Sequence, residues 1–349
     1  MSHDVLYRKY RPQKFSEVSG QESIISILAG EIKSGNFAHA YLFSGSRGTG
    51  KTSVARILAK ELGCSSKDLY EIDAASNTGV DDVRVLREGV RSLPFESPLK
   101  VYLIDEVHML SKAAFNALLK TLEEPPAHVV FILATTELHK VPDTVISRCE
   151  LYAFKRPTIE TLTETVTKIV KKEGTKIDQE AAALVAFLGD GSFRDTLGVL
   201  QKVLAAGGEP VITLELVEAV TGATSLSLVQ EFIKDLLAAD ADQALKILAQ
   251  LVEANLDLKT FNKRVLAELR SAMLVKYAPG LGPDIKAAAG ADRFGFYETI
   301  AAHREAGKLS AILKELLEAH DLIGSTYLAA LPLELAVINI TEKLKTNFK

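Results

Sequence analysis

The clearest chemical pattern in the chain is a glycine-rich loop, GSRGTGKT, at residues 45–52. Glycine accepts backbone angles that side chains block, so this spacing lets successive backbone N–H groups surround a cluster of anionic oxygens. The lysine of such a loop reaches the β- and γ-phosphates of a nucleotide, and the hydroxyl that follows it binds Mg²⁺. The pattern therefore predicts a nucleoside triphosphate site formed by Gly45, Ser46, Arg47, Gly48, Thr49, Gly50, Lys51, Thr52 and Ser53.

The segments that flank this loop favour that interpretation over a plain glycine-rich turn with an exposed lysine. An apolar run at 40–43 predicts a strand before the loop, and the pattern TSVARILAKEL at 52–62 predicts an amphipathic helix after it. The N-terminus of that helix would add unpaired backbone amides and the positive end of its dipole to the phosphate site.

Two acidic residues follow a second apolar run, in VYLIDEVHML at 101–110. The run predicts a buried strand that delivers both acids to the edge of the sheet where open α/β folds bind ligands. We expect Asp105 to hold Mg²⁺ through its water shell and Glu106 to orient and deprotonate an attacking water. An acidic pair after a strand is by itself more often a helix cap or a solvated turn. Beside the glycine-rich loop, it predicts hydrolysis of the nucleotide.

Three further polar residues have two interpretations each on spacing alone. Thr136, in ILATTE at 132–137, either contacts the γ-phosphate or the water, or bonds to backbone at the end of a strand. Arg148 in ISRCE and Arg194 in GSFRDTL are isolated arginines, and such residues are usually surface cations.

The elements that must position these residues change in character along the chain. Up to about residue 155, short β-branched or aromatic runs alternate with helical patterns, which predicts a parallel sheet flanked by helices. From Pro157 to about Gly222 only helical periodicity remains, and beyond Thr224 the helices are longer and amphipathic. We therefore expect three domains, at 1–155, 156–222 and 223–349.

Composition adds few constraints. The 349 residues carry a formal net charge of -4, so any contact with nucleic acid must come from a local basic patch. The two cysteines, Cys64 and Cys149, are far apart in sequence, which argues against a disulfide scaffold or a cysteine zinc site and fits a reducing compartment. No apolar stretch approaches the roughly 20 residues of a membrane span, and the first residues lack a signal peptide's apolar core. We expect a cytoplasmic protein without a membrane partner.

The order and separation of GSRGTGKT, LIDEVHMLS, ATTE, SRC and GSFRD resemble AAA+ ATPases of the clamp-loader group. Four further segments, VLYRKYRPQKFSEVSGQE, HAYLFSG, EIDAASNTGVDDVR and FNALLKTLEEPP, are similar to the bacterial DNA polymerase III gamma/tau family across essentially all of the chain. The resemblance implies an α/β AAA+ P-loop domain with a parallel sheet, followed by a small helical lid domain and an all-α collar domain.

The resemblance also implies roles for residues that are ambiguous alone. Thr136 becomes sensor 1, and Arg194 becomes sensor 2, which reaches from the helical lid onto the phosphates of its own subunit. Arg148 becomes the arginine finger that acts on a neighbouring subunit's ATP. Together with Lys51 and Glu106, Thr136 and Arg148 form the expected catalytic set. The adenine pocket is expected to be lined by Tyr10, Arg11, Pro12 and Val18.

A DNA contact is implied by the segment EIDAASNTGVDDVR, which resembles a family segment leading into a helix that faces the central chamber of the assembled ring. Arg84 and Lys120 occupy matching positions and are expected to contact phosphates. The alternative is that both are solvated helix cations. Some relatives carry additional basic residues where this chain has Asn77 and Gly79.

The sequence departs from the family pattern at one place. Family members typically insert a four-cysteine zinc module after the P-loop helix, whereas here Cys64 is followed directly by SSKDLYEIDAAS. Because structural zinc needs four ligands, we expect no zinc. The extra domains of the longer tau form are also not present in these 349 residues, which resemble the shorter gamma form or a trimmed chain.

These observations predict a DNA-dependent ATPase subunit that uses ATP and Mg²⁺ to open a sliding clamp and load it onto primer-template DNA. The expected partners are delta and delta-prime subunits, other copies of the chain, the sliding clamp and primer-template DNA. One alternative is a non-hydrolysing structural subunit such as delta-prime, which should lack a usable phosphate loop. The other is an AAA+ remodeller of recombination intermediates, which the YRKYRP and EIDAASNTG segments disfavour.

Overall fold

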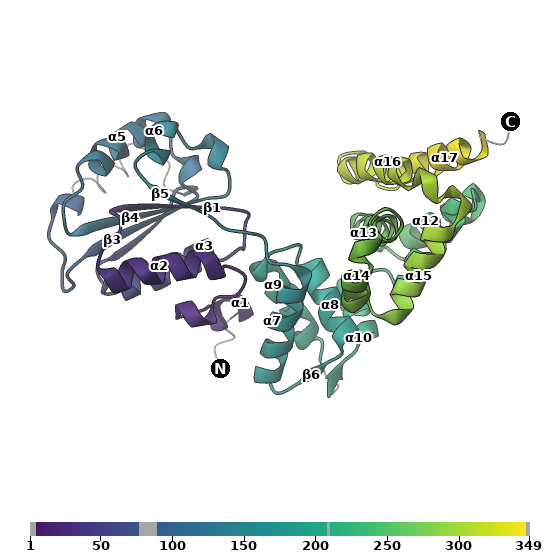
Figure 1. Cartoon of the computed structure of the whole chain (residues 1–349), viewed down its shortest axis with the longest axis horizontal. Helices are drawn as coiled ribbons and strands as arrows, with labels where there is room; N and C mark the ends of the chain where they lie inside the picture. Colours follow the sequence, from purple (N-terminus) through teal and green to yellow (C-terminus); the bar gives the residue numbers. More distant parts are fainter. Residues whose placement is uncertain (1–4, 77–88, 208–209, 347–349) are drawn as a thin grey trace. The chain divides into compact units, whose positions relative to one another are not determined.

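The computed structural model describes residues 5–76, 89–207 and 210–346, and it is shown in Figure 1. The chain divides into two compact units, Met1–Val211 and Ile212–Lys349. The division into three domains at 1–155, 156–222 and 223–349 stays a prediction.

A five-stranded parallel sheet lies at the centre of the first unit, in the order β2-β3-β4-β1-β5. The strands are β1 (Ala40–Ser44), β2 (Leu69–Asp73), β3 (Lys100–Asp105), β4 (Val129–Thr135) and β5 (Glu150–Ala153). The first four coincide with β-branched or aromatic runs in the sequence. The fifth, ELYA, was not predicted, and only Tyr152 of its four residues is buried.

Helices cover both faces of this sheet (Figure 1). On one face α2 (Glu22–Ser34) and α3 (Lys51–Glu61) pack against strand residues such as Tyr41 and Phe43. On the other face α5 (Lys112–Glu123) and α6 (Asp143–Ile146) pack against the alternate residues, such as Leu42. Successive strand residues point to opposite faces, so a strand buried on both faces reads as one continuous apolar run.

The remaining elements of the first unit are short segments around the sheet and three helices that follow it. The short segments are α1 (Leu6–Lys9), η1 (Phe15–Glu17), η2 (Val107–Met109) and η3 (Leu138–Lys140). The three helices, called the lid helices below, are α7 (Ile159–Lys172), α8 (Gln179–Leu188) and α9 (Phe193–Ala205). The residues between Pro157 and Gly222 are mostly helical, as expected, and they also hold two short strands that the sequence did not predict, β6 (Lys176–Ile177) and β7 (Val211–Ile212). Two residues are too few to produce a strand period.

The second unit is helical and has its own apolar core. Its elements are α10 (Leu214–Thr221), α11 (Leu226–Leu237), α12 (Ala241–Glu253), α13 (Leu258–Tyr277), η4 (Pro279–Leu281), α14 (Gly282–Ala289), α15 (Ala291–Ala302), η5 (Arg304–Lys308), α16 (Leu309–Leu322) and α17 (Leu331–Lys345). Phe232 of α11 meets Phe261 of α13 edge to face in the core, with ring centroids 5.1 Å apart. In the part of the chain that the structure describes, no helix is long and apolar enough to cross a membrane.

The loop before β3 is held by one buried carboxylate, Asp68. It accepts hydrogen bonds from the Ser97 hydroxyl (2.6 Å) and from the backbone N–H groups of Phe95, Glu96 and Ser97 (2.5, 3.0 and 2.9 Å). Burial alone would raise the pKa of Asp68, but these hydrogen bonds outweigh it and hold the pKa well below its ordinary value. The charged form of Asp68 is therefore the form that stabilises this loop.

We expect Asp68→Asn to lower the free energy of unfolding at pH 7 by about 2 kcal/mol, because the amide cannot accept all of these donors. The folded-state pKa lies below the unfolded value of about 3.9, so this contribution is present above about pH 4 and is lost as the pH falls through the folded-state pKa. Urea unfolding of both proteins across this pH range measures it. Glu164→Gln, in an exposed pair with Lys168, is the control and should change little. A wild type and an Asp68→Asn variant with the same pH dependence would contradict this account.

Candidate active site

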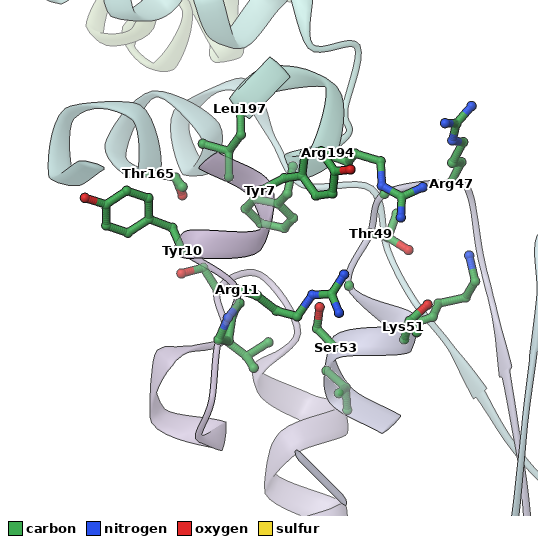
Figure 2. Close-up of a pocket in the computed structure, with 18 of the residues that line it drawn as sticks. Tyr7, Tyr10, Arg11, Arg47, Thr49, Lys51, Ser53, Thr165, Arg194 and Leu197 are labelled. Atoms are coloured by element: carbon green, nitrogen blue, oxygen red, sulfur yellow. The ribbon is translucent and has the colours of Figure 1, made fainter. Parts of the chain in front are cut away.

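One pocket of the first unit lies at the carboxyl edge of the sheet, between the glycine-rich loop and the lid helices (Figure 2). The loop 45–52, called the phosphate loop below, leaves the end of β1 and enters α3. Many of the residues that the sequence predicted for the site line this one pocket. They are Tyr10, Arg11, Pro12, Val18, Arg47, Gly48, Thr49, Gly50, Lys51, Thr52, Ser53, Asp105, Glu106 and Arg194.

Two glycines of the phosphate loop are required by its path. Gly50 has a φ of 101°, which side chains rarely adopt, at the residue that caps α3. A Cβ on Gly48 would lie 1.9 Å from Ser192 Oγ, which is closer than any real contact. The loop therefore needs glycine both to turn into the helix and to let the start of α9 approach.

Lys51 lies inside the phosphate loop and is only 6% exposed. Its Nζ donates to the backbone oxygens of Gly45 (2.8 Å) and Ser46 (3.0 Å), two loop residues that do not themselves line the pocket. Burial lowers the pKa of Lys51, while the nearby Glu106 and Asp105 oppose that shift. Two carbonyl oxygens thus hold the ammonium group of Lys51 at the centre of the loop. A bound phosphate could take their place as its hydrogen-bond partner.

Thr52 and Asp105 meet at the start of α3. The Thr52 hydroxyl donates a hydrogen bond of 2.7 Å to Asp105 Oδ2. Thr52 lies in the first turn of α3, and Asp105 is the last residue of β3. The two elements therefore bring a hydroxyl oxygen and a carboxylate oxygen together. A hydroxyl and a carboxylate are the oxygen ligands that Mg²⁺ prefers.

Glu106 turns away from the strand in a left-handed backbone conformation, with φ 48° and ψ 46°. Its Oε2 accepts hydrogen bonds from the backbone N–H (3.2 Å) and the hydroxyl (2.9 Å) of Thr136. Thr136 does not line the pocket, but it holds a carboxylate that does. Non-glycine residues seldom adopt this conformation, so contacts with neighbouring residues must hold Glu106 in it.

Arginines enter the pocket from two sides (Figure 2). Arg194 comes from the first turn of α9, with its guanidinium carbon 5.4 Å from the centre of the Tyr7 ring. Arg11 comes from the N-terminal segment, and burial lowers its pKa, as do the neighbouring charges of Arg56 and Arg194. These crowded positive charges favour an anion in the pocket.

The phosphate loop contacts the lid helices directly. The backbone N–H of Phe193, the first residue of α9, donates to Gly48 O at 2.9 Å. In the segment that leads from β5 into α7, Arg156 Nε donates to the Ser46 hydroxyl at 3.0 Å. The N-terminal segment is tied to the same helices, since the Tyr10 hydroxyl donates to Glu173 (2.5 Å) and Gln201 accepts from the Leu6 N–H (3.0 Å). Both walls of the pocket are therefore anchored to the lid helices.

Comparison with known proteins gives the family. The family described as "DNA polymerase III, delta subunit" matches residues 20–78 and 66–158. The DNA polymerase III subunit tau of Bacillus subtilis is 42% identical over 302 residues, which cover 80% of this chain and 54% of the relative. The DNA polymerase III subunit gamma of Buchnera aphidicola is 34% identical over 302 residues, covering 80% of this chain and 81% of the relative. The chain belongs to the DNA polymerase III gamma/tau family.

The chain is shorter than some of its relatives, and its fold is similar to that of a solved structure. This gamma/tau chain spans about half the length of the tau relatives, 54% for Bacillus subtilis and 42% for Escherichia coli. The solved structure of a Thermotoga maritima RuvB Holliday junction branch migration motor matches 86% of this chain and 91% of its own, with a TM-score of 0.53 and 19% identity. That likeness shows the fold, and it agrees with the expected arrangement of a parallel sheet followed by helices.

Several pocket residues of the gamma/tau chain were not foreseen from the sequence. Tyr7, Thr165, Ile169, Phe193 and Leu197 line the pocket beside the expected residues. Most lie on the lid helices, where an apolar or small residue looks the same whether it faces a ligand or the core. Glu17 and Ser19, on either side of the expected Val18, line it too.

Gln21 is another residue with no role foreseen from the sequence. It is 4% exposed, and its amide donates to the backbone oxygen of Lys155 (2.8 Å) and accepts from the Lys155 N–H (3.2 Å). The amide thus satisfies both backbone groups of the segment that joins β5 to α7. Nothing in the local sequence marks this glutamine, because its burial depends on the fold.

Besides Gly45, Ser46 and Thr136, three more expected residues do not line the pocket or lie outside the described residues. Arg148 does not line the pocket; its guanidinium pairs with Glu123 at 2.6 Å and donates to Thr144 O at 2.7 Å. Lys120 is exposed near the end of α5. Arg84 lies outside the described residues. The roles of Arg148 as an arginine finger and of Lys120 and Arg84 in DNA binding stay predictions.

The two cysteines do not form a disulfide with each other. Cys64 and Cys149 are free and partly buried, and burial raises the pKa of both thiols, that of Cys149 to about 12. Within the described ranges 5–76, 89–207 and 210–346, no three His, Cys, Asp or Glu side chains group as metal ligands would. The expectation of no zinc stays a prediction.

Proposed function

We propose that this chain is the ATPase motor subunit of a bacterial replicative clamp loader. It uses ATP binding and hydrolysis to open a sliding clamp and to load it onto primer-template DNA. The observation that carries this proposal is a pocket in which the phosphate loop, the two acids at the end of β3 and Arg194 of α9 converge. Membership of the gamma/tau family supports it, because the relatives are subunits of DNA polymerase III.

The donor set at the start of α3 suits a nucleotide-linked magnesium ion. Thr52 and Asp105 would hold it, because their oxygens already meet in the pocket. When bound, Mg²⁺ would neutralise charge on the β- and γ-phosphates.

Residues of the chain bind the nucleotide and accept the proton of the attacking water. Lys51 and the backbone N–H groups of the phosphate loop bind the β- and γ-phosphates, and Arg194 adds a cation from the lid helices. Glu106 accepts the proton of the attacking water, and Thr136 keeps that carboxylate in place through two hydrogen bonds. Tyr10, Arg11, Pro12 and Val18 form the side of the pocket that would receive the adenine.

Nucleotide binding can also affect the lid helices directly, because two residues of the pocket are hydrogen-bonded to them. Gly48 O accepts from the Phe193 N–H, and the Tyr10 hydroxyl bonds to Glu173 at the end of α7. A nucleotide that fills the pocket touches both anchors, so its presence changes the equilibrium position of these helices. In the loader, this movement would align neighbouring subunits that hold the clamp open.

The proposal implies a defined set of partners. They are delta and delta-prime subunits, other copies of this chain, the sliding clamp and primer-template DNA. The decisive experiment mixes the purified chain with these components and measures ATP hydrolysis while each is omitted in turn. We expect hydrolysis to depend on both clamp and primed DNA. Hydrolysis stimulated by branched recombination intermediates and indifferent to the clamp would favour a remodelling motor instead.

Glu106→Gln separates nucleotide binding from chemistry. The amide keeps the shape of the side chain and leaves Asp105 unchanged, but it cannot take a proton from water. We expect ATP and clamp binding to persist while ATP turnover falls about 100-fold or more. Titration of a fluorescent ATP analogue and steady-state phosphate release measure the two effects.

The control for that variant is Glu61→Gln, an exposed glutamate at the end of α3. It should bind and hydrolyse ATP as the wild type does. Unchanged turnover in Glu106→Gln would remove Glu106 from the role of general base.

A further inference from the structure

A buried histidine lies directly behind the proposed general base. The His108 side chain is 5% exposed and does not line the pocket. Its Nδ1 is 3.4 Å from Glu106 Oε2 and 3.0 Å from the Thr135 hydroxyl. Its Nε2 is 3.4 Å from Glu137 Oε1. One imidazole thus joins the pocket carboxylate to a second carboxylate at the end of β4.

The backbone fixes this arrangement. Glu106 has the left-handed conformation, and the 3₁₀ turn η2 follows it at once, closed by a hydrogen bond from Met109 N–H to Glu106 O (2.9 Å). Val107, in the same turn, is fully buried in the core beneath α5. The turn therefore sends Glu106 and His108 toward the same end of β4, where Thr135, Thr136 and Glu137 follow one another.

The groups at the end of β4 are bonded to one another as well. Thr135 Oγ1 accepts from the Glu137 N–H at 3.0 Å, and Glu137 pairs with Lys140 at 2.7 Å. A hydrogen bond from Lys140 is the largest cause of the lowered pKa of Glu137, and His108 contributes to it. The far side of the imidazole therefore faces a carboxylate that stays charged at neutral pH.

We propose that His108 is a positioning residue for hydrolysis, which fixes the direction of the Glu106 carboxylate from behind while Thr136 fixes it from the side. This inference rests on the proposed function, since it concerns the step that Glu106 performs. A general base is effective only when a further group orients it, and a small misplacement of that base costs up to about 100-fold in rate. The rigid ring suits this role, because its two nitrogens contact two carboxylates at a fixed separation.

Two substitutions at His108 distinguish positioning from general support of the fold. His108→Ala removes both ring contacts, whereas His108→Asn keeps an amide nitrogen close to the position of Nδ1. We expect kcat for ATP to fall about 10- to 100-fold in His108→Ala and by less in His108→Asn. The dissociation constant of ATP and the thermal unfolding midpoint should stay near the wild-type values, because His108 does not line the pocket.

The matched control is His139→Ala. His139 is 75% exposed and lies 3.7 Å from the other oxygen of the same Glu137, so the control removes an imidazole beside that carboxylate without touching Glu106. Its kcat should equal that of the wild type.

Glu137→Gln changes the carboxylate on the other side of the His108 ring. We expect a several-fold lower kcat for this variant, with unchanged ATP affinity. This variant decides the matter if His108→Ala fails to fold.

A spectroscopic measurement tests the contact without hydrolysis. In the nucleotide-free chain, Glu106→Gln should shift the ring signals of His108 in the histidine NMR spectrum and leave those of His139 in place. An unshifted His108 signal would overturn the inference.

The kinetic outcomes separate the two proposals. If the wild type, supplied with clamp, partners and primed DNA, neither binds nor hydrolyses ATP, the proposed function fails. If the wild type is active and His108→Ala has the same kcat, only the role of His108 fails. Parallel losses of ATP affinity and kcat in His108→Ala, His108→Asn and Glu137→Gln would show a structural role and overturn positioning.

Discussion

Lys51→Ala is expected to weaken ATP binding strongly and to abolish clamp loading. The ammonium group is the cation at the centre of the phosphate loop, and it already bonds to the carbonyl oxygens of Gly45 and Ser46. Charge-assisted hydrogen bonds to a phosphate contribute about 1.5–3 kcal/mol each, so their loss weakens ATP binding by about 100-fold or more. Titration of ATP by calorimetry measures the affinity, and transfer of labelled clamp to primed DNA measures loading.

The fold should survive this substitution. Lys51 is buried, and burial lowers its pKa, so removal of the ammonium relieves a desolvation cost inside the loop. Lys60→Ala is the matched control, because Lys60 is an exposed lysine of the same helix. It should bind ATP normally. Normal clamp loading by Lys51→Ala would contradict the assignment of the phosphate loop.

The sequence alone predicted the pocket because its chemistry is local. The phosphate loop and the acids of β3 each lie within a few residues of a strong strand pattern. In a parallel sheet, the carboxyl ends of neighbouring strands share one edge. Once β1 and β3 were assigned to one parallel sheet, Lys51 and Asp105 were expected at the same edge, and the structure brings both to one pocket although β4 lies between the two strands.

The parts that were missed depend on contacts between distant segments. Thr165 and Leu197 line the pocket because the lid helices pack against it, and no local pattern marks them. The edge strand β5 was also missed, and three of its four residues are exposed. His108 stood in the motif beside Glu106, but only the position of β4 brings it between two carboxylates.

Arg148 tests whether the chain works with a neighbouring subunit. In the described structure it pairs with Glu123 and a backbone oxygen, and it does not line the pocket of its own chain. We therefore expect Arg148→Ala to leave the ATP affinity of the isolated subunit nearly unchanged. The pair with Glu123 is partly exposed, so its loss should change the free energy of unfolding little.

In the assembled loader, the same substitution should suppress DNA-stimulated hydrolysis by about 1000-fold or more, because the neighbouring subunit loses a cation positioned at the departing phosphate. Phosphate release from loaders assembled with each variant measures this effect. Lys168→Ala, which removes an exposed cation from α7, is the control and should retain full activity.

Mixing two variants should expose the geometry of the interface. A complete site combines Glu106 of one subunit with Arg148 of its neighbour, so Arg148→Ala and Glu106→Gln disable different halves of it. In a mixed ring, an Arg148→Ala subunit that receives the arginine of a Glu106→Gln neighbour has one intact site. Hydrolysis by mixed rings should then exceed that of rings made with either variant alone. If mixed rings show no recovery, and isolated Arg148→Ala protein has already lost ATP binding, Arg148 acts within its own chain. The action of one subunit on its neighbour's ATP would then be excluded for this residue.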